Sequence, residues 1–368
     1  MYGEKVIVAY VKTNVHDHHE YLIKLGILEE LIRSLGGKVV CRTIQVRRKP
    51  RVDYVFGKGK IEELKNKISE VKATSVVFYN TLSSKQRWNL ERVLRVEVLD
   101  RYDVTLEVFK EASQDVLSKL QIEMAALKKM FPYVKLQASI KYKKMRAGFK
   151  GGGEYAYHKQ INAIQRRMKI LRRKIEKCRT RKIEEIRKKK ESGGKIVVLV
   201  GHYNAGKTSL FNRLTGLNKP VSSSPFTTLS SKYANLLDGS TYLVDTIGFV
   251  VDQDPRLITS FEINLIDIMN ADLALLVIDA SDRSKVFDLK LKEVTNILRS
   301  IEVDSEKVIP VLNKVDLIDE KELLEKRDKV IEAGYSSPVM VSALTGYGTT
   351  ELLSAVRSKL KRRLVLEI

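Results

Sequence analysis

Residues 201–208 of this 368-residue chain have the types and spacing needed to bind a phosphate chain. Their sequence, GHYNAGKT, fits the pattern G-x-x-x-x-G-K-[ST] and lies between an apolar, strand-like run and an amphipathic, helix-like run. In such a P-loop, the backbone amides and the positive end of the following helix surround the phosphates. We therefore expect Lys207 to reach the β- and γ-phosphates, and the hydroxyl of Thr208 to bind Mg²⁺. The loop alone does not separate ATP from GTP.

Three later motifs, each after a predicted strand, make that separation. In DTIG, Asp245 is placed to hold the Mg²⁺ shell through water, and Gly248 to offer its amide to the γ-phosphate. In NKVD, the carboxylate of Asp316 can accept both N1–H and N2–H₂ of guanine, a donor pair that adenine lacks. VSALTG resembles the last guanine-contacting loop of GTPases, with the backbone around Ala343 near the base oxygen. The expected nucleotide is therefore GTP.

A further threonine should close over the γ-phosphate and complete the Mg²⁺ coordination in the GTP state. The segment SSSPFTTLSS offers Thr227 and Thr228, and spacing alone does not decide between them. The residues expected to contact the nucleotide are Gly201, His202, Tyr203, Asn204, Ala205, Gly206, Lys207, Thr208, Ser209, Phe226, Thr227, Thr228, Asp245, Gly248, Asn313, Lys314, Asp316, Ser342, Ala343 and Leu344.

Two residues of the site bear on the rate of hydrolysis. Phe249 stands where Ras-like enzymes carry a glutamine that orients the attacking water, and a phenyl ring cannot hydrogen-bond water in that way. We expect slow intrinsic hydrolysis unless a partner or a second cation helps. Asn204 either helps to bind K⁺ beside the phosphates or only stabilises the loop.

The elements around the site follow from hydrophobic patterning. Residues 1–100 alternate strand-like runs (VIVAYV, KVVCRTIQV, SVVFYN, VEVLD) with amphipathic stretches near 19–35, 60–71 and 83–94. This alternation predicts a small α/β domain with a largely parallel sheet. An α/β domain with the P-loop follows at 195–368, after a linker at 191–194.

Residues 101–190 have a helical pattern instead. Apolar residues recur at intervals of three and four, at Leu117, Leu120, Met124, Leu127 and Phe131, and again at Ile161, Ile164, Met168, Leu171, Ile175 and Cys178. This spacing predicts two long helices packed as an antiparallel hairpin. The stretch between them, AGFKGGGEYAYHK at 147–159, has too many glycines for a helix and predicts an exposed loop.

Positive charge is concentrated on the second helix. The chain carries a formal charge of +22, and residues 159–190 hold fifteen Lys or Arg against three Glu, a net charge of +12. Because an ordinary solvated helix face mixes both signs, we favour contact with phosphates over simple solvation. The phosphates could belong to nucleic acid or to an anionic membrane surface.

Other features set the expected compartment. Cys41 and Cys178 lie far apart and match no zinc or redox spacing, which favours a reducing cytoplasm. No run is long enough for a membrane span or resembles a signal peptide. HDHHE at 16–20 suits capping and solvation better than a metal site, and GKGK at 57–60 suits a helix start or a phosphate contact equally.

The motifs together resemble the HflX family of GTPases. The matching segments include GHYNAGKTSLFNRLTG, FTTL, DTIGFV, DPRLITSF, VIDASD, NKVD and VSALTG, and in the first half RRKPRVDYVFGKGKIEEL, VEVLDRYDVTLEVF and LQIEMAALKKMFP. The resemblance places the family's switch I threonine on Thr228. It places the family's Mg²⁺ ligands on Thr208 and Thr228. With the motif assignments above, the expected metal residues are Thr208, Thr228 and Asp245, and the expected residues of hydrolysis are Lys207, Thr228 and Gly248. FKGGGEYAYHK stands where the family commonly has a longer glycine run ending in GPGE.

The resemblance also implies a GTPase that binds the large ribosomal subunit, with its helical hairpin on ribosomal RNA near the peptidyl transferase region. It further implies a ribosome-splitting or rescue factor. We expect a monomer in the cytoplasm, with weak association with the membrane surface as an alternative. Two other readings remain: a membrane-surface regulatory GTPase whose basic helix binds anionic lipid, and an RNA-binding or chaperone module with a vestigial GTPase.

Overall fold

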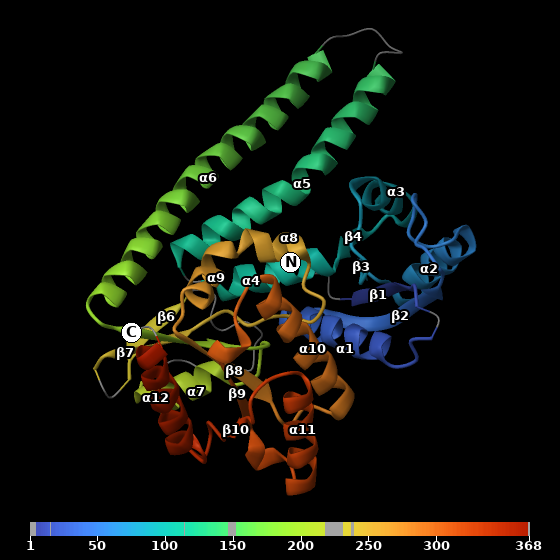
Figure 1. The fold of residues 1–368 in the computed structure, drawn as a ribbon. Coiled ribbons are helices and arrows are strands. Elements are labelled where there is room, and N and C mark those ends of the chain that lie inside the picture. Colours follow the sequence, from blue (N-terminus) through green and yellow to red (C-terminus); the bar gives the residue numbers. More distant parts are fainter. Residues whose placement is uncertain are drawn as a thin grey trace. The chain divides into compact units, whose positions relative to one another are not determined.

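The computed structural model describes residues 5–14, 16–113, 115–145, 152–217, 231–236 and 239–366. The chain divides into two compact units. One unit comprises residues 1–111 and 119–176, and the other comprises residues 112–118 and 177–368. Figure 1 traces the elements of both units in chain order.

The first unit contains a four-stranded parallel sheet in the order β2-β1-β3-β4. The strands are mostly buried, and Ile7, Phe56 and Phe78 lie in their core. Helices alternate with strands, because parallel neighbours need a crossover. The elements are β1 (Lys5–Lys12), α1 (Glu20–Ser34), β2 (Lys38–Val46), α2 (Lys58–Val71), β3 (Ser75–Phe78), α3 (Ser84–Leu94), β4 (Glu97–Asp100) and α4 (Arg101–Ala112).

The second unit contains a six-stranded sheet in the order β10-β9-β8-β5-β7-β6, in which only the edge strand β6 is antiparallel. Its elements are β5 (Lys195–Val200), α7 (Lys207–Thr215), β6 (Lys232–Asn235), β7 (Thr241–Asp245), α8 (Pro255–Ser260), α9 (Glu262–Met269), β8 (Leu273–Asp279), α10 (Ser284–Ser300), β9 (Val308–Asn313), α11 (Glu320–Glu332), β10 (Val339–Met340) and α12 (Thr349–Leu366), with short 3₁₀ turns at Ser305–Lys307 and Val315–Leu317. The carboxyl ends of β5, β7, β9 and β10 lead into the four motifs expected to bind the nucleotide.

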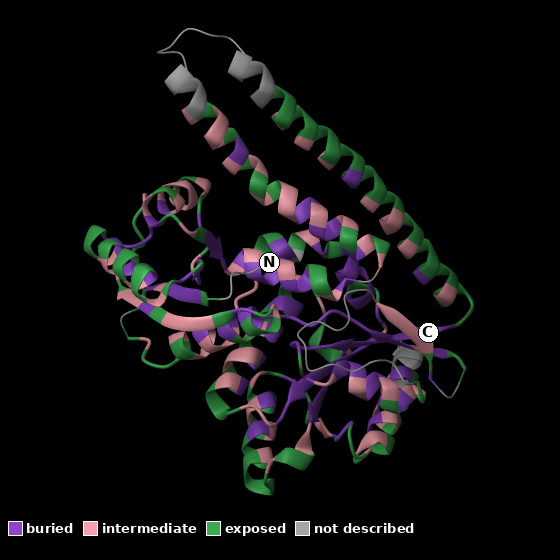
Figure 2. Cartoon of the chain, turned by 180° about the vertical axis from the view of Figure 1, so that it is seen from behind, coloured by how far each residue is buried: buried purple, intermediate pink, exposed green. Residues whose placement is uncertain are grey.

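The two long helices are α5 (Val116–Met145) and α6 (Gly152–Glu191), which run in opposite directions (Figure 1). From residue 158 of α6 onward, the predicted positions Ile161, Ile164, Met168, Leu171, Ile175 and Cys178 are all partly or fully buried. All the remaining side chains from 158 to 178 are exposed, and in Figure 2 the outer side of α6 is accordingly mostly green. The α/β fold class with a helical hairpin is therefore confirmed. The domain limits at 100, 190 and 194 stay predictions.

The predicted loop at 147–159 is wrong for residues 152–159, which form the first turns of α6. Glycine inside a helix costs about 1 kcal/mol relative to alanine. Gly152 and Gly153 lie at the end of a 40-residue helix, where amides lack intrahelical partners in any case, so the rest of the helix outweighs this cost. Residues 147–151 lie outside the described residues.

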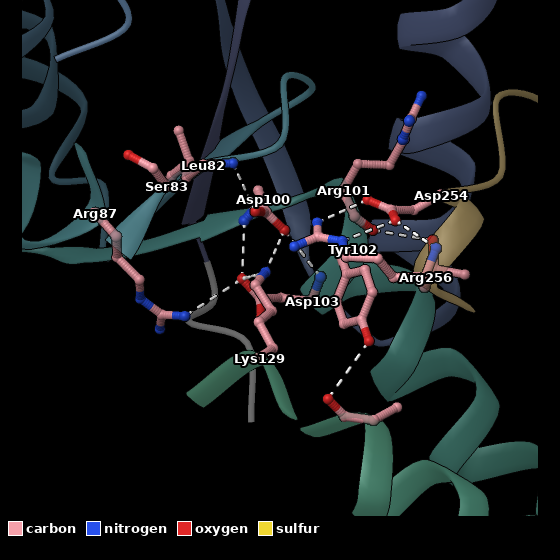
Figure 3. A network of polar contacts seen from close by, with 12 residues as sticks. Leu82, Ser83, Arg87, Asp100, Arg101, Tyr102, Asp103, Lys129, Asp254 and Arg256 are labelled. Carbon is pink, nitrogen blue, oxygen red and sulfur yellow. Dashed lines mark hydrogen bonds and ion pairs between the residues drawn. The ribbon is translucent and has the colours of Figure 1, made fainter. Parts of the chain in front are cut away.

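A buried ion-pair cluster joins α5 to the sheet of the first unit (Figure 3). Asp100 ends β4, is fully buried and accepts the amides of Leu82 at 2.9 Å and Asp103 at 3.1 Å. Lys129 of α5 lies 2.5 Å from the Asp100 carboxylate and 2.8 Å from that of Asp103. Burial raises the pKa of Asp100, as does the charge of Asp103, whereas the Lys129 ammonium opposes the rise. The cluster thus holds the first long helix at the end of a strand.

A second buried pair joins α6 to the second unit. Lys182 lies 2.5 Å from the fully buried carboxylate of Asp267 in α9 and donates to the hydroxyl of Ser231 at 3.2 Å. The hydroxyl of Tyr233 donates to the same carboxylate at 2.5 Å. The carboxyl half of α6 is therefore tied to the residues that begin and precede β6.

Candidate nucleotide-binding site

The P-loop is built on glycines that no other residue could replace without displacement. Gly201 has φ +150°, and a Cβ there would lie 2.1 Å from the carbonyl oxygen of Val277. Gly206 has φ +87°, and a Cβ there would lie 2.2 Å from the Asn313 side-chain nitrogen. Asn204 adopts the left-handed region with φ +60°, which asparagine tolerates better than most residues. The loop between β5 and α7 therefore has its shape fixed by the neighbouring strands.

Lys207 is buried at the start of α7 and points back over the loop. Its ammonium donates to the carbonyl oxygens of Gly201 at 3.1 Å and His202 at 2.6 Å. Burial lowers the pKa of Lys207 to about 8. A Cβ on Gly248 would lie 3.0 Å from the ammonium nitrogen, so the DTIG backbone passes directly beside it. The structure thus brings Lys207 and Gly248 together.

Two of the three predicted Mg²⁺ ligands lie together. The Thr208 hydroxyl donates to the Asp245 carboxylate at 2.9 Å, and both residues are buried. A hydroxyl and a carboxylate are the hard oxygen donors that Mg²⁺ prefers, so the residues present fit this ion. Thr228, Thr227 and Phe226 lie outside the described residues.

The P-loop is backed by a strand-like pairing with the DTIGF segment. The amide of Tyr203 donates to the Phe249 carbonyl at 2.9 Å, and the Phe249 amide donates to Gly201 at 3.1 Å. Phe249 is only 2% exposed, so its ring packs into the interior. His202 is also buried, with Nε2 2.9 Å from the Lys290 carbonyl oxygen, and burial lowers its pKa to about 3. His202 is therefore a neutral packing residue in this arrangement.

Asn313 joins three of the motifs. Its side-chain amide donates to the Ala205 carbonyl in the P-loop at 2.9 Å and accepts the amide of Ala343 at 3.0 Å. These contacts align NKVD and VSALTG beside the phosphate loop. The hydroxyl of Ser342 accepts the Thr345 amide at 3.1 Å and shapes the last loop from within.

A cavity of about 650 Å³ opens beside these motifs. Asp316 and Lys314 line one part of it, and Ala343 and Leu344 line another, so the predicted base-binding residues face a common space. The complete lining is Gly206, Ser209, Asn212, Arg213, Gly216, Leu217, Asn313, Lys314, Asp316, Leu317, Ala343 and Leu344. Half of the lining residues are apolar or glycine, the other half are polar, and Asp316 is the one carboxylate among them, a combination that can hold a purine and select its edge.

Sequence reasoning did not find Arg213. Its guanidinium donates to the carbonyl oxygens of Ala343, at 3.1 Å, and Leu344. It therefore holds the VSALTG loop from the helix that follows the P-loop. Arg213 lies six residues after Lys207 within the quoted stretch, but nothing in the sequence shows that it meets a loop 130 residues later.

The basic residues of α6 form a second candidate site. The exposed ones are Lys159, Arg166, Arg167, Lys169, Arg172, Arg173, Lys174, Lys177, Arg181, Arg187, Lys188 and Lys190. The three half-buried ones have partners in the second unit: Arg179 with Glu262, Lys182 with Asp267, and Lys189 over the Tyr233 ring. The exposed set, named here the basic face of α6, leaves most of its charge toward solvent.

The sequence also raises the questions of membrane helices, metal sites and the roles of the HDHHE and GKGK segments. None of the helices within the described ranges combines the length and apolar character needed to cross a membrane. Among these residues, no group of three or more His, Cys, Asp and Glu side chains gathers as a metal site would require. In the HDHHE segment, Asp17 accepts the amide of His19 and Glu20 pairs with Lys24. GKGK begins α2, with Gly57 at the cap position.

The fold and the site define a P-loop GTPase. Family models match along the chain: residues 24–110 match "GTP-binding GTPase N-terminal", residues 114–190 match "GTP-binding GTPase Middle Region", and residues 196–314 match "50S ribosome-binding GTPase". These matches cover both compact units.

Curated relatives place the chain within a family. A GTPase HflX of Thermofilum pendens is 35% identical over 337 residues, which cover 91% of this chain and 79% of that protein. A GTPase HflX of Thermococcus kodakarensis is 34% identical over 302 residues, which cover 81% and 68%. A solved structure described as a complex of SsGBP and GDP is 25% identical, covers 97% of this chain and 98% of that chain, and has a TM-score of 0.52. The chain belongs to the HflX family of GTPases, and the predicted resemblance is confirmed. It binds guanine nucleotides and hydrolyses GTP.

Proposed function

We propose that this chain is a GTP-switched ribosome-binding protein. It acts as a cytoplasmic monomer, and the basic face of α6 contacts ribosomal RNA of the large subunit. A family model described as a 50S ribosome-binding GTPase, matching residues 196–314, supports the choice of partner. The concentrated positive charge supports the choice of surface, because neutralising many phosphates releases bound counterions.

The observation that carries the proposal is the direct connection between the basic face and the nucleotide site. Helix α6 ends at Glu191, β5 begins at Lys195, and β5 leads into the P-loop. In addition, Lys182 of α6 contacts Ser231, the last residue of the segment SSSPFTTLSS that holds the candidate switch threonines. A change in that segment on GTP binding would therefore act on α6 through Lys182, and a change in the P-loop would act on it through β5.

Within the site, each residue has a proposed role. The Lys207 ammonium binds the β- and γ-phosphates, and Gly248 offers its amide to the γ-phosphate. Thr208, Thr228 and Asp245 hold Mg²⁺, which would neutralise charge on the phosphates when bound. Because Phe249 is buried and cannot orient water, hydrolysis is slow without a partner. Asn204 contributes to a K⁺ site beside the phosphates.

Base recognition is tested by exchanging hydrogen-bond partners. Asp316→Asn should favour xanthosine over guanosine nucleotides, because an amide can donate to the extra oxygen of xanthine. The measurement is a competition titration with GDP and XDP. Indifference of the variant to the base would refute the role of this carboxylate.

The partner is tested by co-sedimentation. The chain is mixed with purified large ribosomal subunits or with anionic phospholipid vesicles, in the presence of GDP or a non-hydrolysable GTP analogue. We expect the chain to pellet with subunits and more strongly in the GTP-analogue state. Binding to vesicles but not to subunits would establish the membrane-surface alternative, and binding that ignores the nucleotide would establish the RNA-binding module with a vestigial GTPase.

The surface is tested by charge removal. We replace five exposed cations of α6 by Gln: Arg166, Lys169, Arg172, Arg173 and Lys174. This change should weaken subunit binding, and the slope of log affinity against log salt concentration should become shallower by about 0.9 for each lost phosphate contact. A matched control replaces five exposed cations outside α6, on α10, α11 and α12: Lys285, Lys292, Arg299, Lys321 and Arg357. Equal losses in both variants would mean that net charge matters and the basic face does not.

Coupling is tested at Lys182. Lys182→Met removes the ammonium that bridges Asp267 and Ser231 while keeping a long apolar stem. We expect subunit binding to persist while the difference between the two nucleotide states shrinks. Unchanged nucleotide dependence would exclude this contact as the connection.

Ribosome splitting is a further part of the proposal. Adding the chain with the GTP analogue to assembled ribosomes should lower their light scattering, and GDP should not. Constant scattering, together with positive sedimentation, would restrict the function to subunit binding.

A further inference from the structure

Asp279 lies at the carboxyl end of β8, next to the base-binding motifs but outside them. It belongs to the VIDASD segment and is only 7% exposed. One oxygen of its carboxylate accepts both the amide of Ser281 at 2.9 Å and its hydroxyl at 2.6 Å. The other oxygen lies 2.5 Å from the ammonium of Lys314. The carboxylate is thus held in one orientation on one side and binds a lysine on the other.

Lys314 is the lysine of NKVD, and its backbone is unusual. It has φ +66°, a left-handed conformation that lysine rarely adopts. Its Cε lies 4.0 Å from the position that a Cβ on Gly206 would occupy, so its stem passes over the end of the P-loop. Lys314 also lines the 650 Å³ cavity beside Asp316. The apolar stem therefore forms part of the wall of the base pocket.

The methylene chain of a lysine can form a well-defined pocket wall only if its ammonium is held in place. Lysine has large rotamer entropy, and immobilising such a side chain on binding lowers affinity. Here the ammonium is paired with a buried carboxylate, and the Lys314 side chain is only 25% exposed. The pair limits the positions that the lysine stem can take, which is the arrangement expected of a preorganised pocket.

We propose that Asp279 is a positioning residue for guanine nucleotides. It holds the Lys314 ammonium so that the lysine stem covers one face of the base, and it does not touch the nucleotide itself. This inference rests on the proposed role of Lys314 and Asp316 in binding the base. It predicts that Asp279 affects the affinity for any purine nucleotide in this pocket, whichever base Asp316 selects.

The test is a double-mutant cycle on the full chain with fluorescently labelled GDP and Mg²⁺. Asp279→Asn keeps an acceptor for Ser281 but weakens the hold on Lys314, and it should lower GDP affinity about three- to tenfold. Lys314→Met removes the ammonium and keeps the stem length. In the Lys314→Met background, Asp279→Asn should cause no further loss, because its effect passes through the ammonium. The rate of hydrolysis at saturating GTP should stay unchanged by Asp279→Asn.

A matched control is Asp288→Asn. Asp288 pairs with Lys329 at 2.7 Å, neither residue lines the base pocket, and its replacement should leave GDP affinity unchanged. Thermal melting of each variant verifies that the chain is folded. An unchanged affinity in folded Asp279→Asn would overturn the inference. The inference would also be overturned if Asp279→Asn lowered GDP affinity equally in the parent and in the Lys314→Met background. That result would mean that Asp279 acts through the turn at Ser281.

The same cycle in the Asp316→Asn background separates this inference from the proposed function. With XDP as the probe, Asp279→Asn should lower the nucleotide affinity by the same factor as it lowers GDP affinity when Asp316 is present. If Asp316→Asn does not change base preference but the cycle still couples Asp279 to Lys314, the proposed base selection fails and the positioning role stands. If base preference switches but the cycle shows no coupling, the positioning role fails alone.

Discussion

Two aspartates end strands of the two sheets, and they have different surroundings. Asp100 ends β4 in the first unit and Asp245 ends β7 in the second, and both are fully buried. Asp100 is matched by Lys129 of α5, at 2.5 Å. The Asp245 carboxylate accepts the hydroxyl of Thr208 and interacts electrostatically with Lys207, the lysine expected to bind the phosphates. Burial of an aspartate at a strand end is therefore not enough to indicate a ligand site.

The difference shows what separates a structural carboxylate from a functional one. Charged groups in the interior must be compensated. At Asp100, Lys129 of α5 compensates the charge, and the pair attaches the hairpin to the sheet. At Asp245, the nearby cation is Lys207 of the P-loop, and the carboxylate and the Thr208 hydroxyl form an oxygen donor set of the kind that Mg²⁺ prefers. The element that supplies the partner, and not the burial, separates the two roles.

The largest expected effect is on stability at the first aspartate. Lys129→Met leaves the buried Asp100 charge without its cation, and it should lower the free energy of unfolding by about 3–5 kcal/mol. Urea unfolding measures this loss. The adjacent exposed Lys128→Met should change little, and Lys129→Met combined with Asp100→Asn should recover part of the loss. GDP affinity should not change in any of them, and a shared loss of affinity would contradict the comparison.

The second effect is on catalysis at the other aspartate. Asp245→Asn weakens the Mg²⁺ donor set and should slow GTP hydrolysis by about a hundredfold, as measured by phosphate release under single-turnover conditions. Asp100→Asn, once shown to be folded by circular dichroism, should hydrolyse GTP at the parent rate. Equal slowing in both variants would show that the two aspartates are not functionally distinct.

The third effect is a dependence of stability on pH at His202. Burial lowers the pKa of His202 from 6.5 to about 3, so the unfolded chain binds a proton between these values and the folded chain does not. The contribution of this group therefore lowers the free energy of unfolding by about 1.4 kcal/mol for each pH unit as the pH falls from 6.5 toward the folded pKa. His202→Gln, which keeps an N–H donor for the Lys290 carbonyl, should show a shallower loss of stability between pH 6 and pH 4.

The matched control is the exposed His158. His158→Gln should have the same pH profile as the parent, because this exposed side chain keeps its contact with water when the chain folds. A profile of His202→Gln that superimposes on the parent would mean that His202 is charged in the folded state.

The smallest effect concerns a pair on the surface. Arg167 of α6 binds Glu123 of α5 at 2.5 Å, but the two side chains are 49% and 38% exposed. Because water screens such pairs, Arg167→Ala should lower the free energy of unfolding by less than about 1 kcal/mol in urea denaturation. A loss as large as that of Lys129→Met would show that geometry outweighs burial in this hairpin.

Much of the fold could be predicted because the signals are local. The strands of the first unit, the helix seam of α6 and the strand–loop–helix context of the P-loop each lie within a few tens of residues. The loop at 147–159 was wrong in its second half because glycine content is a weak local penalty, and the length of α6 outweighs it. Where a residue's intrinsic conformational preference is small, the stability of the surrounding helix determines the conformation of that residue.

The sequence by itself determined the nucleotide chemistry, because the phosphate loop and the base-selecting carboxylate depend on residue types at short, fixed spacings. Only the tertiary structure decided which distant residues serve these motifs. Asp279 meets Lys314, Arg213 meets the VSALTG loop, and Lys129 meets Asp100 across 29 to 130 residues of chain. Such pairings depend on how strands and helices pack, and charge partners so far apart in the chain have no spacing that a sequence could reveal.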